Sequence, residues 1–147
     1  MGGTQGVCTA EGEIKIIVNC KLEIGNFKME EKADQLSERL LDYGVEIIKL
    51  TEKLDKTASG KYIANQLLRA GTSVGSNYEE ARGAQSRADF VHKLQIVLKE
   101  IREALYWLRL IQKSKILNGS DLGSIITETI QLSNIVAKSV ITAKKND

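Results

Sequence analysis

The spacing of apolar residues along the chain predicts four α-helices. From about residue 30 onward, apolar side chains recur at alternating intervals of four and three residues, which places them on one side of a helix. The predicted helices cover about residues 30–54, 60–84, 87–114 and 120–143. Because short polar segments join them, consecutive helices are expected to run antiparallel. The predicted fold class is therefore an all-α, up-down-up-down four-helix bundle.

The first predicted helix carries more apolar surface than one bundle core can bury. Its main stripe has the a/d spacing of helices packed at a shallow angle and consists of Leu36, Leu40, Tyr43, Ile47, Leu50 and Leu54. A second stripe, formed by Leu41, Val45 and Ile48, lies roughly 100–180° further round the helix. Gly44 falls inside this helix, where it costs about 1 kcal/mol relative to alanine and indicates either close packing or local weakness.

The second predicted helix combines a polar position in its core stripe with a pair of glycines. The stripe runs through Ile63, Leu67, Ala70, Val74, Asn77, Ala81 and Ala84, so an asparagine is expected to face the core. On one flank, Gly71 and Gly75 allow another backbone to approach closely. On the other flank lie Arg69, Ser73 and Glu80.

These polar residues are expected to meet Glu100 and Glu103 of the third helix, near Lys99. They form either a binding site or a structural network that sets the register of helices or subunits. We favour the structural role, because an asparagine in an apolar stripe is a register device and unpaired buried charge is costly. The predicted network comprises Arg69, Ser73, Asn77, Glu80, Glu100 and Glu103.

Polar residues at three helix starts are candidate N-caps, whose side chains accept hydrogen bonds from the first free backbone N–H groups. They are Ser59 for the second helix, Ser86 or Gln85 for the third, and Ser120 for the fourth. Asp89 follows Ser86 by three residues, as in a capping box.

Apolar residues outside the core stripes predict that the chain associates with itself. Exposed strips of this kind usually mark interfaces. The interface candidates are Leu41, Val45, Ile48, Tyr106, Trp107 and Leu110. The alternative is that these side chains cover the edges of one bundle or pack under the N-terminal segment.

Residues 1–28 differ in composition from the bundle domain predicted over residues 29–147. They are rich in glycine at first and then carry a β-prone run at Ile14–Val18. We expect a leader that is flexible or partly ordered, or a strand that pairs with another copy or a partner, because a lone strand is not stable by itself. A further possibility is that the working protein begins at Met29.

No residue pattern in the chain supports catalysis or a metal. Ser73 and Ser76 have no histidine placed to activate them, and a di-iron bundle needs two E-x-x-H motifs where this chain has only His92. Cys8 and Cys20 with one histidine cannot complete a familiar zinc site. The expectation is a non-enzyme without cofactor or metal.

Composition is that of an ordinary globular domain, with 42% hydrophobic and 27% charged residues and no proline in 147 residues. No apolar run reaches the roughly 18 residues that a membrane span needs, and the first residues lack the features of a secretory signal. We therefore expect a cytoplasmic protein with free thiols and no membrane partner.

The central stretch LRAGTSVGSNYEEA, followed by SRADFVHKLQIVLKEIREALYWLRLI, resembles the bacterial four-helix-bundle family known from proteins encoded in 23S ribosomal RNA intervening sequences. The resemblance covers about residues 29–143 and is carried by the R-x-G-T-S-x-G-x-N-x-x-E-A pattern at Arg69–Ala81. It implies a bundle that assembles into a ring, commonly a homopentamer. A similar fold and sequence style belongs to the accessory variability determinant proteins of diversity-generating retroelements, which are basic pentamers that bind nucleic acid and a reverse transcriptase.

A local excess of basic residues supports nucleic-acid binding. The chain carries a net charge of only +2, but the segment from Arg87 to Lys115 holds seven basic residues against three acidic ones. In a ring this excess is multiplied into a cationic surface. The candidate residues are Arg87, Lys93, Lys99, Arg102, Arg109 and Lys113. The alternative is an ordinary solvated helix face.

The predicted function is that of a non-enzymatic, homo-oligomeric, pentameric adaptor that associates with RNA or DNA. Its most specific form is a retroelement accessory protein that binds a reverse transcriptase and RNA. The alternative is a purely structural protein-interaction module without affinity for nucleic acid. A neighbouring reverse transcriptase gene with a template repeat favours the first.

Overall fold

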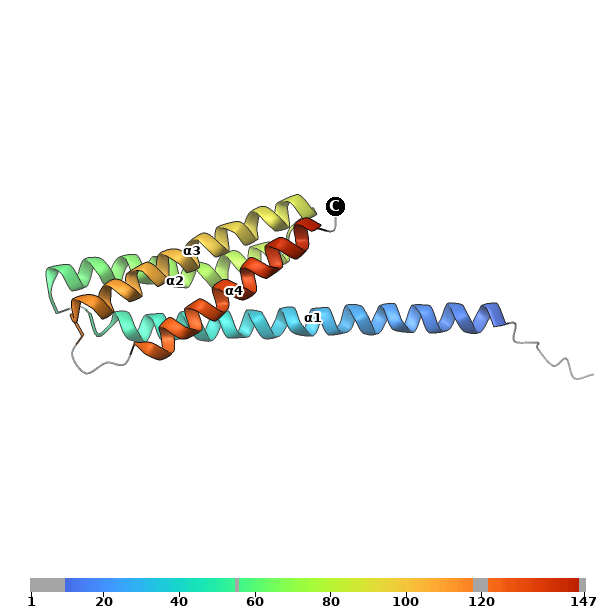
Figure 1. Ribbon diagram of the computed structural model, residues 1–147, viewed down its shortest axis with the longest axis horizontal. Coiled ribbons are helices and arrows are strands. Elements are labelled where there is room, and N and C mark those ends of the chain that lie inside the picture. Colours follow the sequence, from blue (N-terminus) through green and yellow to red (C-terminus); the bar gives the residue numbers. More distant parts are fainter. Residues whose placement is uncertain (1–9, 55, 118–121, 146–147) are drawn as a thin grey trace, which may run out of the picture. The chain divides into compact units, whose positions relative to one another are not determined.

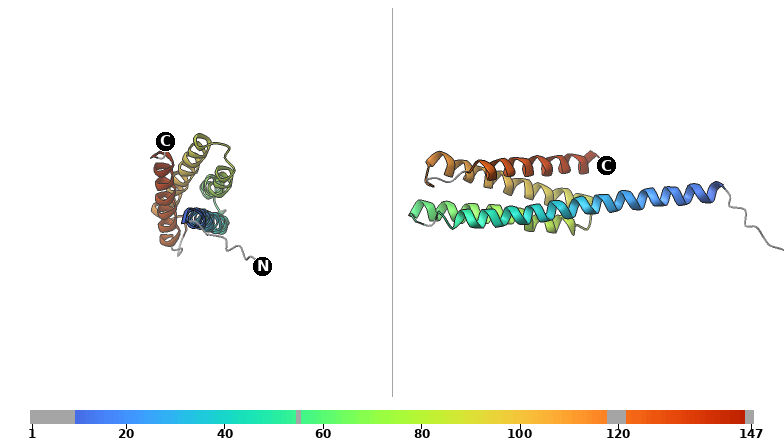
Figure 2. Two further views of the ribbon diagram at one scale, coloured as in Figure 1. Left: turned by 90° about the vertical axis from the view of Figure 1, so that its right-hand side faces the viewer. Right: turned by 90° about the horizontal axis from the view of Figure 1, so that it is seen from below.

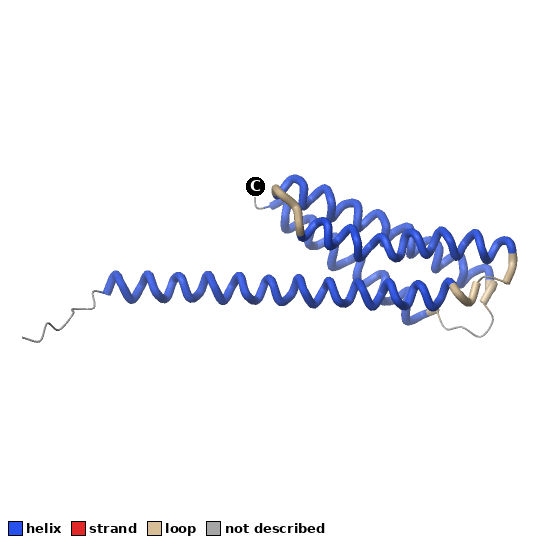
Figure 3. Tube along the Cα trace, turned by 180° about the vertical axis from the view of Figure 1, so that it is seen from behind, coloured by secondary structure: helices blue, strands red, loops and turns tan. Residues whose placement is uncertain are grey.

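The structure is a computed structural model that describes the backbone of residues 10–54, 56–117 and 122–145, and within these ranges the side chains from residue 28 onward. Four helices follow one another: α1 (Ala10–Thr51), α2 (Ala58–Arg82), α3 (Arg87–Ser114) and α4 (Gly123–Lys145), as Figure 1 shows. These described ranges contain no strand (Figure 3). The all-α four-helix bundle predicted from the sequence is confirmed.

The chain divides into two compact units, Met1–Leu36 and Ser37–Asp147. In the second unit, α2, α3, α4 and the C-terminal part of α1 each occupy one corner of the bundle when it is viewed end-on (Figure 2, left). Its core is formed by the large side chains that face inward from all four helices. Those with less than 2% exposure are Leu40, Ile47, Leu67, Val74, Leu94, Val97, Ile101, Leu108, Ile111, Thr129, Leu132 and Val136.

The first helix begins earlier than predicted. It starts at Ala10 rather than near residue 30, so the β-prone run Ile14–Val18 is helical, and the alternative of a strand there is wrong. A helix satisfies its backbone N–H and C=O groups within one segment, whereas a strand without a partner leaves them unpaired. Residues 1–9 of the predicted leader lie outside the described residues.

The start of α2 is capped by Thr57, not by Ser59 as predicted. Thr57 has extended backbone angles, and its Oγ1 accepts a hydrogen bond from the backbone N–H of Gly60 at 3.0 Å. The predicted cap of α3 is confirmed, since Ser86 Oγ accepts from the Asp89 N–H at 3.1 Å. The predicted cap of α4, Ser120, lies outside the described residues.

Asn77 does not occupy the core stripe of α2, which corrects the sequence-based prediction. The stripe steps from Val74 to Tyr78, which is only 7% exposed, and Asn77 is half-buried beside it. An α-helix has 3.6 residues per turn, so a strict 4-3 repeat drifts round the helix, and a step of four restores the inward direction. The Asn77 Nδ2 donates to the Ser73 carbonyl of its own helix at 2.8 Å. The asparagine is therefore not a register device across the core.

Gly60 and Gly71 are positions where α2 needs a glycine, and at Gly60 an added Cβ would clash with the backbone carbonyl of Leu54. A Cβ built at Gly71 would lie 2.8 Å from both Cγ1 and Cγ2 of Ile47 on α1, which is closer than real contacts of this kind. At Gly75 the nearest atom, the Leu40 carbonyl oxygen, would be at an ordinary 3.6 Å. At Gly71 the close contact is with a side chain and not with another backbone. The backbone of α1 lies beside α2 at Gly75, but at a distance where an alanine would still fit, so the close backbone approach predicted for the two glycines is not observed.

Candidate interaction surfaces

An apolar groove of about 510 Å³ runs between the second unit's part of α1 and α2. We call it the α1–α2 groove. Three large apolar side chains of α1 line it while remaining exposed: Leu41 (61%), Val45 and Ile48. Its other lining residues are Ser37, Leu40, Gly44, Thr72, Gly75, Ser76 and Glu79. The Ser37 hydroxyl donates a hydrogen bond to the Glu79 carboxylate across the two helices.

Gly44 lines this groove without being needed for packing inside the chain. A Cβ built on it would meet no heavy atom within 4 Å of the described structure. A glycine in a helix interior costs roughly 0.5–1 kcal/mol relative to alanine. The groove therefore has room for a side chain at Gly44.

A second surface, which we call the aromatic cluster, joins Tyr62 of α2 to Tyr106 and Trp107 of α3. The Trp107 ring lies 5.0 Å from the Tyr106 ring at an interplanar angle of 77° and 6.0 Å from the Tyr62 ring at 79°. Both tyrosines stay open to solvent, with 60% of Tyr62 and 59% of Tyr106 exposed. Trp107 is half-buried and is held between them.

The aromatic cluster contacts the charged residues of the predicted polar network, Arg69, Glu100 and Glu103, through Trp107. Trp107 Nε1 lies 3.5 Å from Glu103 Oε1, at the outer limit of a hydrogen bond, and Arg69 Nη2 donates to the same carboxylate oxygen. Arg69 Nη1 also lies 3.6 Å from Glu100 Oε2. Arg69 thus neutralises charge beside the aromatic rings and joins α2 to α3.

The other predicted network members do not join this cross-helix group in the part of the chain that the structure describes. The Ser73 hydroxyl donates to the Arg69 carbonyl at 2.6 Å, and Asn77 bonds to Ser73, so both stay within α2. Glu80 is exposed. Short polar side chains can reach the carbonyl one turn back in their own helix, which competes with bonds to another helix.

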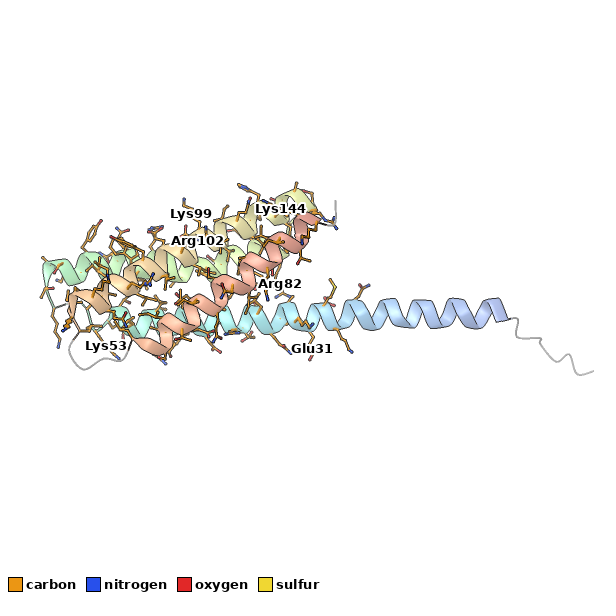
Figure 4. All side chains as sticks on the ribbon, viewed as in Figure 1. Glu31, Lys53, Arg82, Lys99, Arg102 and Lys144 are labelled. Carbon is orange, nitrogen blue, oxygen red and sulfur yellow. The ribbon has the colours of Figure 1, made fainter. Side chains whose placement is uncertain are left out.

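A basic stripe along α3 contains four of the residues predicted to bind nucleic acid: Lys99, Arg102, Arg109 and Lys113. Figure 4 labels Lys99 and Arg102. All four are exposed, and the described residues place no carboxylate in an ion pair with any of them. The other two candidates lie near the start of α3. There Lys93 Nζ pairs with Asp89 Oδ2 at 3.2 Å, and this contact lowers the pKa of the Asp89 carboxyl.

The interface residues predicted as one set lie on separate surfaces. Leu41, Val45 and Ile48 belong to the α1–α2 groove, whereas Tyr106 and Trp107 belong to the aromatic cluster beside the basic stripe. Leu110 is half-buried on α3. Sequence spacing assigns residues to helix faces, but it does not say which faces of different helices adjoin.

A buried polar pair between α1 and α4 was not predicted. Thr129 Oγ1 lies 3.0 Å from the Tyr43 hydroxyl and 2.6 Å from the Ile125 carbonyl oxygen. The carbonyl can only accept, and the shorter bond takes the single threonine proton, so Tyr43 is the donor to Thr129. Burial raises the pKa of Tyr43 to about 12. Nearby, Arg39 holds Glu128 through two bonds of 2.6 and 2.7 Å.

The described residues include no helix long and apolar enough to cross a membrane. They also contain no group of three or more histidine, cysteine or acidic side chains placed to hold a metal ion.

Residues 30–138 match the family described as 23S rRNA-intervening sequence protein. This chain belongs to that family. The family match includes the α1–α2 groove, the aromatic cluster and the basic stripe. Helix α1 before residue 30 and the end of α4 lie outside it.

One solved structure is also similar to this chain. It is a protein with unknown function from the S23 ribosomal protein family of Bacteroides thetaiotaomicron VPI-5482, with 33% sequence identity and a TM-score of 0.68. The match covers 74% of this chain and 97% of the other. No curated protein matches the chain.

Proposed function

We propose that this family member is a non-enzymatic, homo-oligomeric protein that assembles through the α1–α2 groove and serves as a nucleic-acid-associated adaptor in the cytoplasm. The observation that carries self-association is the exposed apolar strip of Leu41, Val45 and Ile48 over an open groove. Apolar side chains grouped in this way lower their free energy when another surface covers them.

A different apolar surface on the same chain supports a second copy as the occupant of the groove. On α4, Ile130 and Ile141 are exposed, the latter by 54%, and their spacing places them on the same side of the helix. A contact in which apolar residues of one copy enter the groove of the next is a head-to-tail contact, which closes into a ring when the rotation between copies is suitable. A homopentamer is the form that the family resemblance implies.

Replacing Leu41 by glutamate tests this assembly. The substitution places a charge in the apolar groove, so we expect the mass measured by light scattering and native mass spectrometry to fall to that of one chain. Asn65→Glu adds the same charge at an exposed position of α2 outside the groove and should leave the mass unchanged. A wild-type chain that is monomeric at micromolar concentration refutes the proposal.

The basic stripe on α3 supports the nucleic-acid part of the proposal. Its four exposed cations form no ion pair within the described residues, so they are available to phosphates. Each further copy in an assembly adds four more. Affinity for labelled RNA or DNA should fall as salt concentration rises. If nothing binds even at low salt, the purely structural interaction module is the better description.

A retroelement accessory role is the most specific form of this function. In that role the assembled protein binds a reverse transcriptase and its RNA. Co-purification of a reverse transcriptase encoded beside this gene tests it directly, and absence of such a gene from the neighbourhood counts against it.

A further inference from the structure

An aromatic residue interrupts the basic stripe of α3 at its centre. Lys99, Arg102, Tyr106, Arg109 and Lys113 follow one another at i, i+3, i+7, i+10 and i+14, so they share one side of the helix. At 1.5 Å per residue the row extends for about 21 Å. It places cations on both sides of an exposed ring, which is the combination that holds single-stranded nucleic acid.

We propose that the aromatic cluster and the basic stripe together bind unpaired nucleotides, with bases stacked on the exposed tyrosine rings and phosphates on the flanking cations. This inference rests on the proposed nucleic-acid function and names its ligand class as single-stranded RNA or DNA. Paired bases already stack within their duplex, so exposed aromatic rings cannot stack on their faces.

The ring geometry leaves stacking surfaces available. Both tyrosines meet Trp107 at nearly perpendicular angles of 77° and 79°, so neither has a parallel stacked partner among the described ring pairs. With about 60% of each tyrosine exposed, a flat base can lie against either ring.

The charged network holds this surface in place before a ligand arrives. Glu103 accepts from both Trp107 and Arg69, which restrains the indole between the two tyrosines. Arg69 also offsets the negative charge of Glu103, which would otherwise repel a phosphate next to the rings. Arg69 and Glu103 are therefore positioning residues for the aromatic cluster.

Charge disfavours another copy as the symmetric occupant of the same surface. A contact that pairs this face with itself would bring two rows of four cations together. The apolar strip that suits a subunit contact lies in the α1–α2 groove instead. A head-to-tail contact through Tyr106 remains an outcome that the experiment detects.

Binding of the full chain to unstructured 20-nucleotide RNA and DNA strands and to matching duplexes tests the inference by fluorescence anisotropy. The wild type should bind the single strands more tightly than the duplexes, and comparison of RNA with DNA separates the two sources. Trp107 is the only tryptophan of the chain, so its fluorescence should change when a base stacks beside it.

Tyr106→Leu should weaken single-strand binding by about tenfold, equal to about 1.4 kcal/mol, at every salt concentration. Tyr106→Phe, which keeps the ring, should bind as the wild type does. Arg109→Gln should reduce the slope of log affinity against log salt by about 0.7. Lys49→Gln on α1, outside the stripe, should not change the slope. Thermal melting checks that each variant is folded.

Equal affinity for single strands and duplexes overturns the inference, and so does a Tyr106→Leu variant with unchanged affinity. In both cases Arg109→Gln can still reduce the slope of log affinity against log salt. The protein then binds nucleic acid through its cations, and the proposed nucleic-acid function stands without the stacking. A Tyr106→Leu variant whose assembly mass falls shows that another copy covers the cluster and also overturns it. If the wild type binds no nucleic acid at low salt, the proposed function itself fails.

Discussion

Gly44 and Gly71 should respond in opposite ways to the same substitution, although both lie inside long helices. At Gly44 an added Cβ meets nothing within 4 Å, so Gly44→Ala should gain most of the helix-propensity difference, about 1 kcal/mol. At Gly71 the added Cβ lies 2.8 Å from two carbons of Ile47. Overpacking of this kind costs typically 1–3 kcal/mol, which exceeds the propensity gain. Gly71→Ala should therefore destabilise the bundle.

The stability of an oligomer depends on protein concentration, so both substitutions belong in the Leu41→Glu background, which we expect to be monomeric. Urea denaturation followed by circular dichroism gives the free energy of unfolding for each variant. For a chain of this size, a gain of about 1 kcal/mol raises Tm by roughly 2–4 °C. If Gly44→Ala destabilises this monomer as much as Gly71→Ala does, the space at Gly44 is filled and the reasoning is wrong.

A larger residue at Gly44 separates folding from assembly. Gly44→Leu keeps the helix-propensity gain, but its side chain occupies the α1–α2 groove. In the otherwise wild-type chain we expect a folded protein of reduced assembly mass. An unchanged mass by light scattering would show that the groove is not the subunit contact.

Three further predictions concern point substitutions. The Tyr43 pKa is raised from its ordinary value of 10 to about 12, so the protonated side chain stabilises the fold fully below pH 10, and this stabilisation is lost as pH rises through 12. Urea denaturation should show that the free energy of unfolding falls by about 2.7 kcal/mol over this range in the wild type, and that Tyr43→Phe removes this pH dependence. Tyr78→Ala should lower the free energy of unfolding by about 3 kcal/mol, whereas Asn77→Ala should leave it nearly unchanged. If Asn77→Ala is the more destabilising of the two, Asn77 and not Tyr78 faces the core. Thr57→Ala should lower the free energy of unfolding by about 1 kcal/mol and Ser59→Ala by much less, because only the first is the N-cap.

The four helices could be predicted from residues that lie close together in the sequence. The 4-3 spacing of apolar residues and the cap at Ser86 were sufficient to predict four helices and the start of α3. Such signals depend on residues within one or two turns of each other, which is why they can be read along the chain. The drift of a real helix away from the 4-3 repeat appeared only in the structure, where Tyr78 takes the place expected for Asn77.

The residues of the candidate surfaces were also named from the sequence, but their grouping was not. Exposure of Leu41 and Tyr106 follows from their position opposite a core stripe. Tyr62 was missed, because only the packing of α2 against α3 brings it beside Trp107. The pairing of Tyr43 with Thr129 was missed for the same reason, since 86 residues separate them in the chain.

By itself, the sequence determined that the chain is helical, that two helices have surplus apolar surface, and that α3 has an excess of positive charge. Only the tertiary structure decided which of these features adjoin. It showed that Gly71 touches Ile47 while Gly44 faces an open groove, and that Tyr62 of α2 lies beside Trp107 of α3. The physical reason is that helix periodicity sets the direction of each side chain, whereas contacts between helices depend on how their axes pack.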